Sequence, residues 1–587
     1  MNPADFYQRQ VQKHTNGFRQ KNKQSQIFTV IRLTVFLLTV LLIYYFWSMG
    51  PITVISVAVV GLIGFLIAVV KHRTIDTQKD LEKILVQLNE EEIKRYYGEL
   101  PETGFGRRYL NGNNLFAKDF DIFGKQSLYH HVNRCVLQKS SDKLADFLIE
   151  LKDRDEVQDR QLILKELRER IEWVQKYQAR LQLMSSRTKE EVDLGDFENV
   201  KKNNTTQFLA LGLLAISLTI IALFFVGIVP FAFLLIIAVI NYSIMMRYQA
   251  SIFHLGIKTD VLIKHIQTHL EAMRLISQVA FASQPLQKIT RSITKKTLAE
   301  IESLERTIRW LDSRGNMLYG ILNAFLVLDL FTYYTLTSWM NRNSKQFNEW
   351  IDVVYEMEMY ASLASYVYQN PNFIFPELSA SDYIFESEDM GHPLIRPEER
   401  VCNDFSFDKE RLYLVTGSNM SGKSTFLRTI GLNTVMAWIG LPVCAHSFKV
   451  SRYLVFSSMR TQDDLAENTS SFYAELRRIK LLFSLLENTE VPVLYFLDEI
   501  LKGTNSGDRH NGSIGIIRKL LDRNARGFIS THDLELADDY ESNEVVKNIS
   551  FNSTLRSGEL HFDYKLSEGK CYSTNASQLM KSMGIID

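Results

Sequence analysis

The sequence predicts a C-terminal α/β domain joined to an all-α region that contains transmembrane helical hairpins. Three observations lead to this fold class. A glycine-rich motif lies between a predicted strand and a predicted helix at residues 417–425, two apolar runs with polar ends follow it, and long apolar runs interrupt the N-terminal half. With 587 residues, the chain is long enough for several domains.

The glycine-rich motif fits GxxxxGK[ST] in full. Its residues are Gly417, Ser418, Asn419, Met420, Ser421, Gly422, Lys423, Ser424 and Thr425. The apolar run 412–415 before it is typical of a buried strand, and 426–430 opens a helix. In such a loop, successive backbone N–H groups hold a phosphate chain at the helix N-terminus, the lysine reaches the β- and γ-phosphates and the next serine holds Mg²⁺. The motif therefore predicts a P-loop NTPase that binds ATP and Mg²⁺, with Ser424 as a metal ligand.

Two later apolar runs end in side chains that nucleotide hydrolysis requires. The run 493–497 is typical of a buried parallel strand and leads to Asp498 and Glu499. We expect Asp498 to lie behind the Mg²⁺ and Glu499 to polarise the attacking water. A further run, 527–530, leads to His532, which can reach the γ-phosphate from the next strand. A lone histidine at a strand end is more often structural, but the series of such strand ends favours a catalytic role.

Several segments resemble the MutS family of ATPases. They are the loop 417–428, in which Asn-Met is typical of the family, and the segments 391–395, 463–476, 498–506 and 530–532. The resemblance implies an ABC/MutS-type nucleotide domain, with 391–395 as the strand that leads into it, and it covers a helical core at about 115–380 more loosely. In the family, the segment that matches 463–476 contacts the γ-phosphate bound in the partner subunit. The resemblance therefore implies a homodimer in which Ser470 completes the site of the other copy.

The sequence departs from the family pattern at a few positions. Ser418 stands where proline is usual, Ser421 and Leu501 where glycine is usual, and Lys502 where arginine is usual. None of these changes removes a ligand of phosphate, metal or water. The Cβ of Ser421 is expected to strain a loop position that favours positive φ, which affects the turnover rate rather than nucleotide binding.

Composition says little about partners. Lys and Arg total 67, as do Asp and Glu, so no global basic field indicates nucleic acid as a partner. The four cysteines are scattered without CxxC spacing. This pattern argues against a metal site or a disulfide framework and suits a reducing cytoplasm.

Two pairs of apolar runs predict two transmembrane hairpins. Residues 27–49 and 52–70 form the first pair and about 208–246 the second, each run being near the ~20 residues that span ~30 Å of hydrocarbon. A cleaved signal peptide is the alternative for the first run, but another apolar run follows at once and no small-residue cleavage site intervenes. Basic residues flank the outer ends of both hairpins, which places those ends in the cytoplasm.

A further apolar run, 316–339, contains Asp329 and Asn323. A fifth crossing there would put the ATP site outside the cell, away from ATP. We therefore predict a buried core helix rather than a membrane span.

These inferences give a domain layout. The chain runs from a basic cytoplasmic tail through the first hairpin, a helical cytoplasmic region with the start of the core, the second hairpin and a helical core or lever region to the ATPase domain. The respective ranges are 1–26, 27–73, 74–206, 207–247, 248–384 and 385–587. We expect an integral protein of a bacterial-type inner or plasma membrane, with the ATPase domain in the cytoplasm.

Two functions stay open. In the first, which the family resemblance implies, paired nucleotide domains form a DNA-binding clamp or switch related to mismatch repair. In the second, ATP-driven closure of the dimer acts mechanically on the membrane or on a protein partner of unknown identity. The neutral charge, the lack of a counterpart to the family's mismatch-reading domain and the hairpin inside the core favour the second.

Overall fold

The computed structural model describes residues 2–110, 114–185, 204–253, 259–312, 317–381, 383–460, 471–556 and 559–571. The chain divides into two compact units. The helical unit comprises Met1–Ile93, Cys135–Ser141 and Arg170–Ala361, and the sheet unit comprises Lys94–Arg134, Asp142–Glu169 and Ser362–Asp587.

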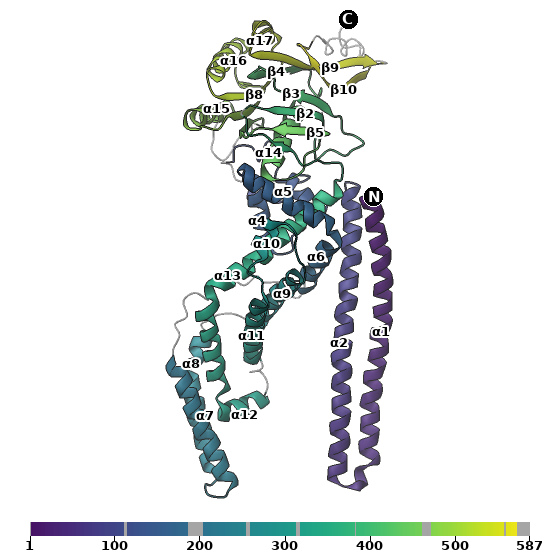
Figure 1. Cartoon of the computed structure of the whole chain (residues 1–587), viewed down its shortest axis with the longest axis vertical. Helices are drawn as coiled ribbons and strands as arrows, with labels where there is room; N and C mark the ends of the chain where they lie inside the picture. Colours follow the sequence, from purple (N-terminus) through teal and green to yellow (C-terminus); the bar gives the residue numbers. More distant parts are fainter. Residues whose placement is uncertain are drawn as a thin grey trace. The chain divides into compact units, whose positions relative to one another are not determined.

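Helices of very different lengths build the helical unit (Figure 1). They are α1 (Pro3–Tyr45), α2 (Pro51–Tyr96), α6 (Ile171–Ser185), α7 (Asn204–Phe225), α8 (Ala232–Phe253), α9 (Thr259–Ser277), α10 (Gln284–Thr290), α11 (Lys295–Asp312), α12 (Met317–Leu326) and α13 (Leu328–Gln369), with a short 3₁₀ turn η1 (Trp47–Met49) between the first two. Helices α2 and α13 begin in this unit, and their last residues are assigned to the sheet unit. α9 packs against α6 and α11.

The residues predicted as a basic tail are helical instead. α1 begins at Pro3 and continues without a break into the first apolar run, and Tyr7 near its start is fully buried. Polar pairs between α1 and α2 explain this extension: His14 Nδ1 lies 2.7 Å from Glu82 Oε2, and Lys21 donates to Gln78 over 2.7 Å. The N-terminal part of α1 therefore forms a helix without a hydrophobic repeat, because hydrogen bonds and ion pairs to α2 stabilise it.

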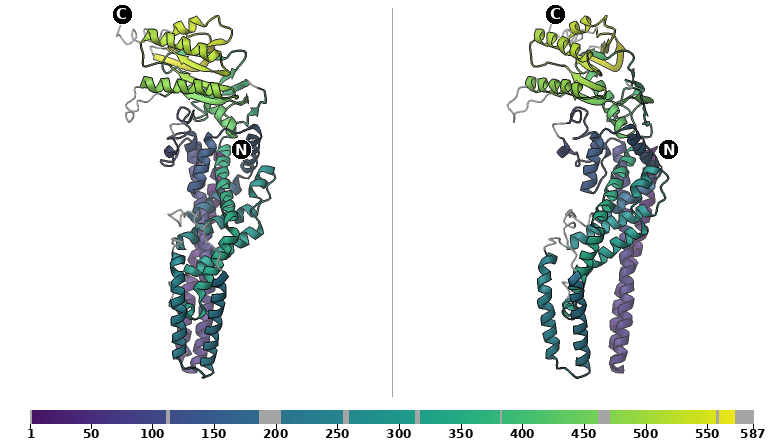
Figure 2. Two further views of the ribbon diagram at one scale, coloured as in Figure 1. Left: turned by 90° about the vertical axis from the view of Figure 1, so that its left-hand side faces the viewer. Right: turned by 60° about the vertical axis from the view of Figure 1, so that its left-hand side comes forward.

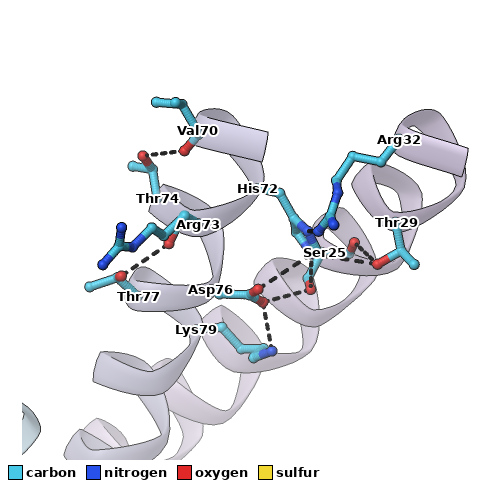
Figure 3. A network of polar contacts seen from close by, with 10 residues as sticks. All are labelled: Ser25, Thr29, Arg32, Val70, His72, Arg73, Thr74, Asp76, Thr77 and Lys79. Atoms are coloured by element: carbon cyan, nitrogen blue, oxygen red, sulfur yellow. Dashed lines mark hydrogen bonds and ion pairs between the residues drawn. The ribbon is translucent and has the colours of Figure 1, made fainter. Parts of the chain in front are cut away.

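A denser polar network joins α1 and α2 next to their apolar parts (Figure 3). Ser25 Oγ donates to Asp76 Oδ1 over 2.7 Å, and Arg32 Nη1 lies 2.9 Å from His72 Nδ1. Because a guanidinium only donates, His72 Nδ1 is the acceptor and the ring carries its proton on Nε2. The arginine inside the first apolar run is thus paired, as a polar side chain at the edge of an apolar layer requires.

Within the described part of the chain, three helices are long and apolar enough to cross a membrane: α1, α2 and the part of α7 from Thr206 to Phe225. The number rises to four if the bent pair α12 and α13 counts as one span. α7 and α8 pack as an antiparallel pair (Figure 2), and the apolar part of α8, Ala232–Arg247, is shorter than a full span.

The single buried helix predicted at 316–339 is wrong. The chain breaks at Val327, where φ is +50°, and α12 and α13 are bent by 79° from one another. Asn323 Oδ1 accepts a 2.9 Å hydrogen bond from the backbone N–H of Asp329, so a side chain takes a donor that a continuous helix would use. Ile321 and Leu322 on α12 are about half exposed, so this segment is not a buried core helix.

The sheet unit holds a six-stranded and a four-stranded sheet (Figure 1). The first has the order β10-β9-β4-β8-β7-β6 and is parallel except for the edge strand β10, and the second has the order β1-β5-β2-β3. The strands are β1 (Glu377–Leu378), β2 (Phe385–Met390), β3 (Asn403–Ser406), β4 (Leu412–Gly417), β5 (Ser447–Val450), β6 (Leu454–Ser458), β7 (Val493–Asp498), β8 (Ala525–Thr531), β9 (Val546–Arg556) and β10 (Glu559–Glu568). The helices are α3 (Leu128–Val132), α4 (Gln138–Ile149, which begins in the helical unit), α5 (Arg154–Glu169), α14 (Lys423–Ile439), α15 (Ser471–Asn488), α16 (Ser506–Leu521) and α17 (Leu534–Asp539), with a 3₁₀ turn η2 (Arg107–Tyr109).

The sheet unit extends beyond the range 385–587 predicted for the ATPase domain, since residues 94–134 and 142–169 belong to it. Asp119, from this N-terminal part, is buried beside β6. Its carboxylate accepts hydrogen bonds from Ser457 Oγ at 2.8 Å and from the backbone N–H groups of Met459 and Arg460, both at 3.1 Å. A segment far away in sequence thus fixes the chain directly after β6.

Candidate functional site

The candidate site is built on the loop between β4 and α14. Every residue of β4 is buried, and the parallel register aligns Thr416 with Thr531 on β8 and Asp498 on β7 with Ser530 on β8. The carboxyl ends of these strands therefore meet at one edge of the sheet, where the loop and the polar strand ends lie together.

Backbone strain in the loop falls on Met420 rather than on Ser421. Met420 has a φ of +67° and Gly422 a φ of +109°, whereas the φ of Ser421 is not positive. The expected strain at Ser421 is therefore wrong. A Cβ at Gly417, in contrast, would lie 2.7 Å from the carbonyl oxygen of Phe551, so that position requires glycine.

Lys423 begins α14 with its side chain folded over the loop. Its Nζ donates to the carbonyl oxygens of Gly417 and Ser418 at 2.8 and 3.0 Å, and the residue is buried. Burial lowers the pKa of the ammonium, whereas the nearby Glu499 and Asp498 act in the opposite direction. A cation is thus held beside the loop amides, at the positive end of a helix.

Ser424, the next residue, contacts the end of β7. Its Oγ donates to Asp498 Oδ2 over 2.7 Å, and the other carboxylate oxygen of Asp498 accepts from Ser530 Oγ. A hydroxyl and a carboxylate in direct contact are the hard oxygen donors that Mg²⁺ prefers.

Glu499 is held between two cationic or hydrogen-bonding partners. Its Oε1 lies 2.8 Å from His532 Nε2, and its Oε2 lies 2.9 Å from Lys502 Nζ. The contact with His532, followed by that with Lys502, lowers the pKa of Glu499 to about 2 although partial burial opposes this shift. Glu499 has a φ of +50°, and its N–H donates to the Ser530 carbonyl over 3.0 Å, so its backbone is fixed as well.

The region that contains the site is similar to known proteins. Residues 413–585 match the family description MutS domain V. The DNA mismatch repair protein MutS of Clostridium botulinum strain Hall is 26% identical over 306 residues, which cover 50% of this chain and 32% of that protein. The DNA mismatch repair protein MutS of Brevibacillus brevis is 33% identical over 219 residues, covering 35% of this chain and 25% of that protein. This chain is a MutS-family protein. It spans about a third or less of the length of these curated relatives.

In this MutS-family protein, the loop forms one wall of a pocket of about 570 Å³ in the sheet unit. Its lining includes Ser418 to Thr425 together with Glu499. Asp498, Gly417 and His532 are outside this lining but contact it through Ser424, Lys423 and Glu499, respectively.

The lining also contains residues that the sequence reasoning did not assign to the site, among them His392, Asn403 and Tyr564. The segment 391–395, expected to be a strand, is a turn that follows β2. Burial, and then Arg428, lowers the pKa of His392 to about 4, so its imidazole is neutral at physiological pH. Gly391-His392-Pro393 was a sequence signal for a turn, whereas nothing in the sequence marked Tyr564, which β10 brings to the pocket.

One predicted catalytic residue, Ser470, lies outside the described residues, as does the rest of 461–470. The described helix α15 begins directly after this segment at Ser471.

Proposed function

We propose that this MutS-family protein is a P-loop ATPase whose phosphate-binding residues are 417–425. The observation that carries the proposal is the 2.7 Å hydrogen bond between Ser424 and Asp498, because it joins the residue after the loop lysine to the strand end that bears Glu499. Lys423 would neutralise the β- and γ-phosphates, and the N-terminal amides of α14 would bind their oxygens. The rest of the pocket lining, which includes His392 and Tyr564, would contact the rest of the nucleotide.

Glu499 is proposed to orient the attacking water as a carboxylate. With a pKa of about 2, its carboxyl group is ionised at neutral pH. His532, which lies 2.8 Å from it, would reach the γ-phosphate. Ser424 and Asp498 would hold the Mg²⁺, which neutralises charge that develops on the phosphates.

A dimeric site is part of the proposal, since the family resemblance implies that Ser470 acts on nucleotide bound in the partner subunit. Ser470→Ala should then leave ATP affinity nearly unchanged and reduce turnover, and turnover per subunit should rise with protein concentration. A turnover rate independent of concentration would contradict the dimeric site.

Membrane anchoring by two hairpins is proposed from α1 with α2 and from α7 with α8. The length and composition of α1, α2 and α7 support it, as do the many apolar side chains of all four helices that are half exposed or more. Lys and Arg outside the apolar runs would keep the sheet unit in the cytoplasm.

The ligand that ATP hydrolysis serves is proposed to be DNA, because the relatives are named DNA mismatch repair proteins. Phosphate contacts by exposed basic residues, such as Lys295 and Lys296 on α11, would then provide most of the affinity. Mechanical action on the membrane or on a protein partner is the second candidate, favoured by the apolar helices.

One experiment separates these candidates: ATPase activity of the full-length protein in liposomes, with and without matched or mismatched duplex. Stimulation of the ATPase by DNA at low salt supports the clamp if it is the same for matched and mismatched duplex and is reduced by charge reversal at Lys295 and Lys296. The affinity for DNA should then fall with salt, with a log–log slope of about −0.9 per phosphate neutralised. Stimulation by lipid alone supports the mechanical function. A lack of ATPase activity under every condition would refute the proposed function.

A further inference from the structure

The break between α12 and α13 combines an apolar surface with paired polar groups, the two features that a helix interruption inside hydrocarbon requires. α12 packs against α7 and α8, and the break residue Val327 lies in one apolar cluster with Ala210 and Leu213 of α7 and Met245 of α8. On the outer side of α12, Ile321 and Leu322 are 51% and 50% exposed, similar to Leu235 and Ile236 on α8 with 54% and 53%. The apolar surface of α7 and α8 therefore continues over α12.

Polar groups at the break have partners within the protein. The Val327 N–H donates to the Asn323 carbonyl over 3.0 Å, and the Asp329 N–H donates to Asn323 Oδ1 over 2.9 Å. Tyr319 OH donates to a carboxylate oxygen of Asp329 over 2.7 Å. A break exposed to water would need none of these contacts, whereas one in lipid requires them, since an unpaired backbone group there costs several kcal/mol.

α8 contributes a buried asparagine that contacts the end of α12 next to the break. Asn241 is fully buried, and its Nδ2 donates to the Ala324 carbonyl over 2.8 Å and to Ser217 Oγ over 2.9 Å. Its Oδ1 is buried and accepts no hydrogen bond within the described part of the chain. An asparagine in this position is explained by the freed carbonyl of α12, not by packing.

The bend of 79° between the two arms argues against a straight crossing. α12 has 10 residues, which rise by about 15 Å, half of the ~30 Å hydrocarbon layer. After the break, α13 remains mostly apolar to Met340 and then presents the exposed charges of Arg342 and Lys345. A chain that enters on α12, turns at Val327 and leaves on α13 returns to the side it came from.

We propose that α12 and the first turns of α13 form a re-entrant element whose exposed apolar side chains contact lipid acyl chains beside α7 and α8. The proposal rests on the membrane anchoring proposed above and adds a fifth membrane-embedded helix. It places a polar kink, with Asp329 and Asn323, inside the hydrocarbon layer at the start of the 42-residue helix α13.

Spin labels on the full-length protein in liposomes test the proposal. Single cysteines replace Ile321 or Leu322, with Ile236 as the lipid control and Lys345 as the water control, in a variant whose four native cysteines are serine and whose ATPase activity is retained. We expect labels at 321 and 322 to collide with oxygen several-fold more than with a water-soluble nickel chelate, as at 236, and the opposite at 345. Labels at 321 and 322 that behave like the label at 345, with 236 still in lipid, would overturn the re-entrant element but not the anchor. Water exposure at 236 as well would overturn both.

Sidedness is tested separately with an impermeant maleimide on sealed inverted and right-side-out membrane vesicles. Cysteines at Lys345 and at Glu102, an exposed residue after α2, should react in the same vesicle type. Reaction in opposite types would mean that the α12–α13 segment crosses the membrane, and the re-entrant arrangement would be refuted.

Discussion

Lys502 Nζ lies 2.9 Å from Glu499 Oε2 within one turn of chain after β7. With His532 on the other carboxylate oxygen, this ion pair lowers the pKa of Glu499 to about 2, with His532 as the larger cause. Because the folded pKa is depressed, the stability that Glu499 contributes is fully present above its unfolded pKa and is lost as pH falls toward 2. A carboxyl group with this pKa is ionised across the physiological range, as the proposed role in hydrolysis requires.

Lys502→Gln should therefore raise the pKa of Glu499 toward its ordinary value and move the acid limb of the pH dependence of kcat to higher pH. Lys502→Arg keeps the charge and should leave the limb in place, and His532→Gln should move it further than Lys502→Gln. The measurement is kcat against pH at saturating ATP, extended down to the lowest pH at which the protein stays folded, because the wild-type limb is expected near pH 2. An acid limb that Lys502→Gln does not move would show that Lys502 does not tune Glu499.

The lysine and the glutamate of the site should separate binding from turnover. Lys423→Ala removes the charge beside the loop amides and should weaken ATP binding at least tenfold, which is ~1.4 kcal/mol. Glu499→Gln keeps the shape of the site and should retain affinity while kcat falls by roughly 10²–10⁴. Isothermal titration and steady-state kinetics measure the two effects, with the exposed Lys409→Ala as the control. Equal loss of affinity in both variants would contradict the assigned roles.

Asp119 should control the order of the chain after β6. Asp119→Ala leaves three donors, Ser457 Oγ and the amides of Met459 and Arg460, without their acceptor. We expect the two amides to exchange hydrogen at least tenfold faster, since a lost buried acceptor costs about 1–3 kcal/mol. Hydrogen exchange with mass spectrometry on the full-length protein measures this change, and the exposed Asp408→Ala should have no effect. Unchanged exchange at these amides would mean that other contacts fix this segment.

The sequence predicted those parts of the sheet unit that a short stretch of neighbouring residues determines. β4, β7 and β8 were predicted within a few residues, because uninterrupted apolar runs that end in polar residues are typical of buried parallel strands. The start of α14 was placed at residue 426 rather than at Lys423, since the loop motif hides the first helical turn.

Features that depend on tertiary contacts were not predictable. Tyr564 reaches the pocket only because β10 pairs with β9 and β9 with β4, and no motif surrounds it. The break at Val327 depends on side chains of Asn323 and Asn241 that capture backbone groups of other residues, whereas hydropathy alone suggests one continuous helix. The helical start of α1 depends on pairing with α2, which a polar sequence does not reveal.

Asn241→Leu tests whether the contact with Ala324 stabilises the break. Leucine keeps a similar volume and removes both donated hydrogen bonds, which leaves the Ala324 carbonyl unpaired. Hydrogen bonds between helices in membranes contribute about 0.6–2 kcal/mol, so we expect a Tm for the detergent-solubilised protein a few degrees below that of the wild type. Ser243→Ala, which removes only an exposed bond to the Val239 carbonyl on the same helix, should leave the Tm unchanged. A label at Ile321 should also become more mobile in the Asn241→Leu background and not in the Ser243→Ala background. Equal Tm values and equal mobility in the two variants would mean that the kink is held by the apolar cluster around Val327 rather than by Asn241.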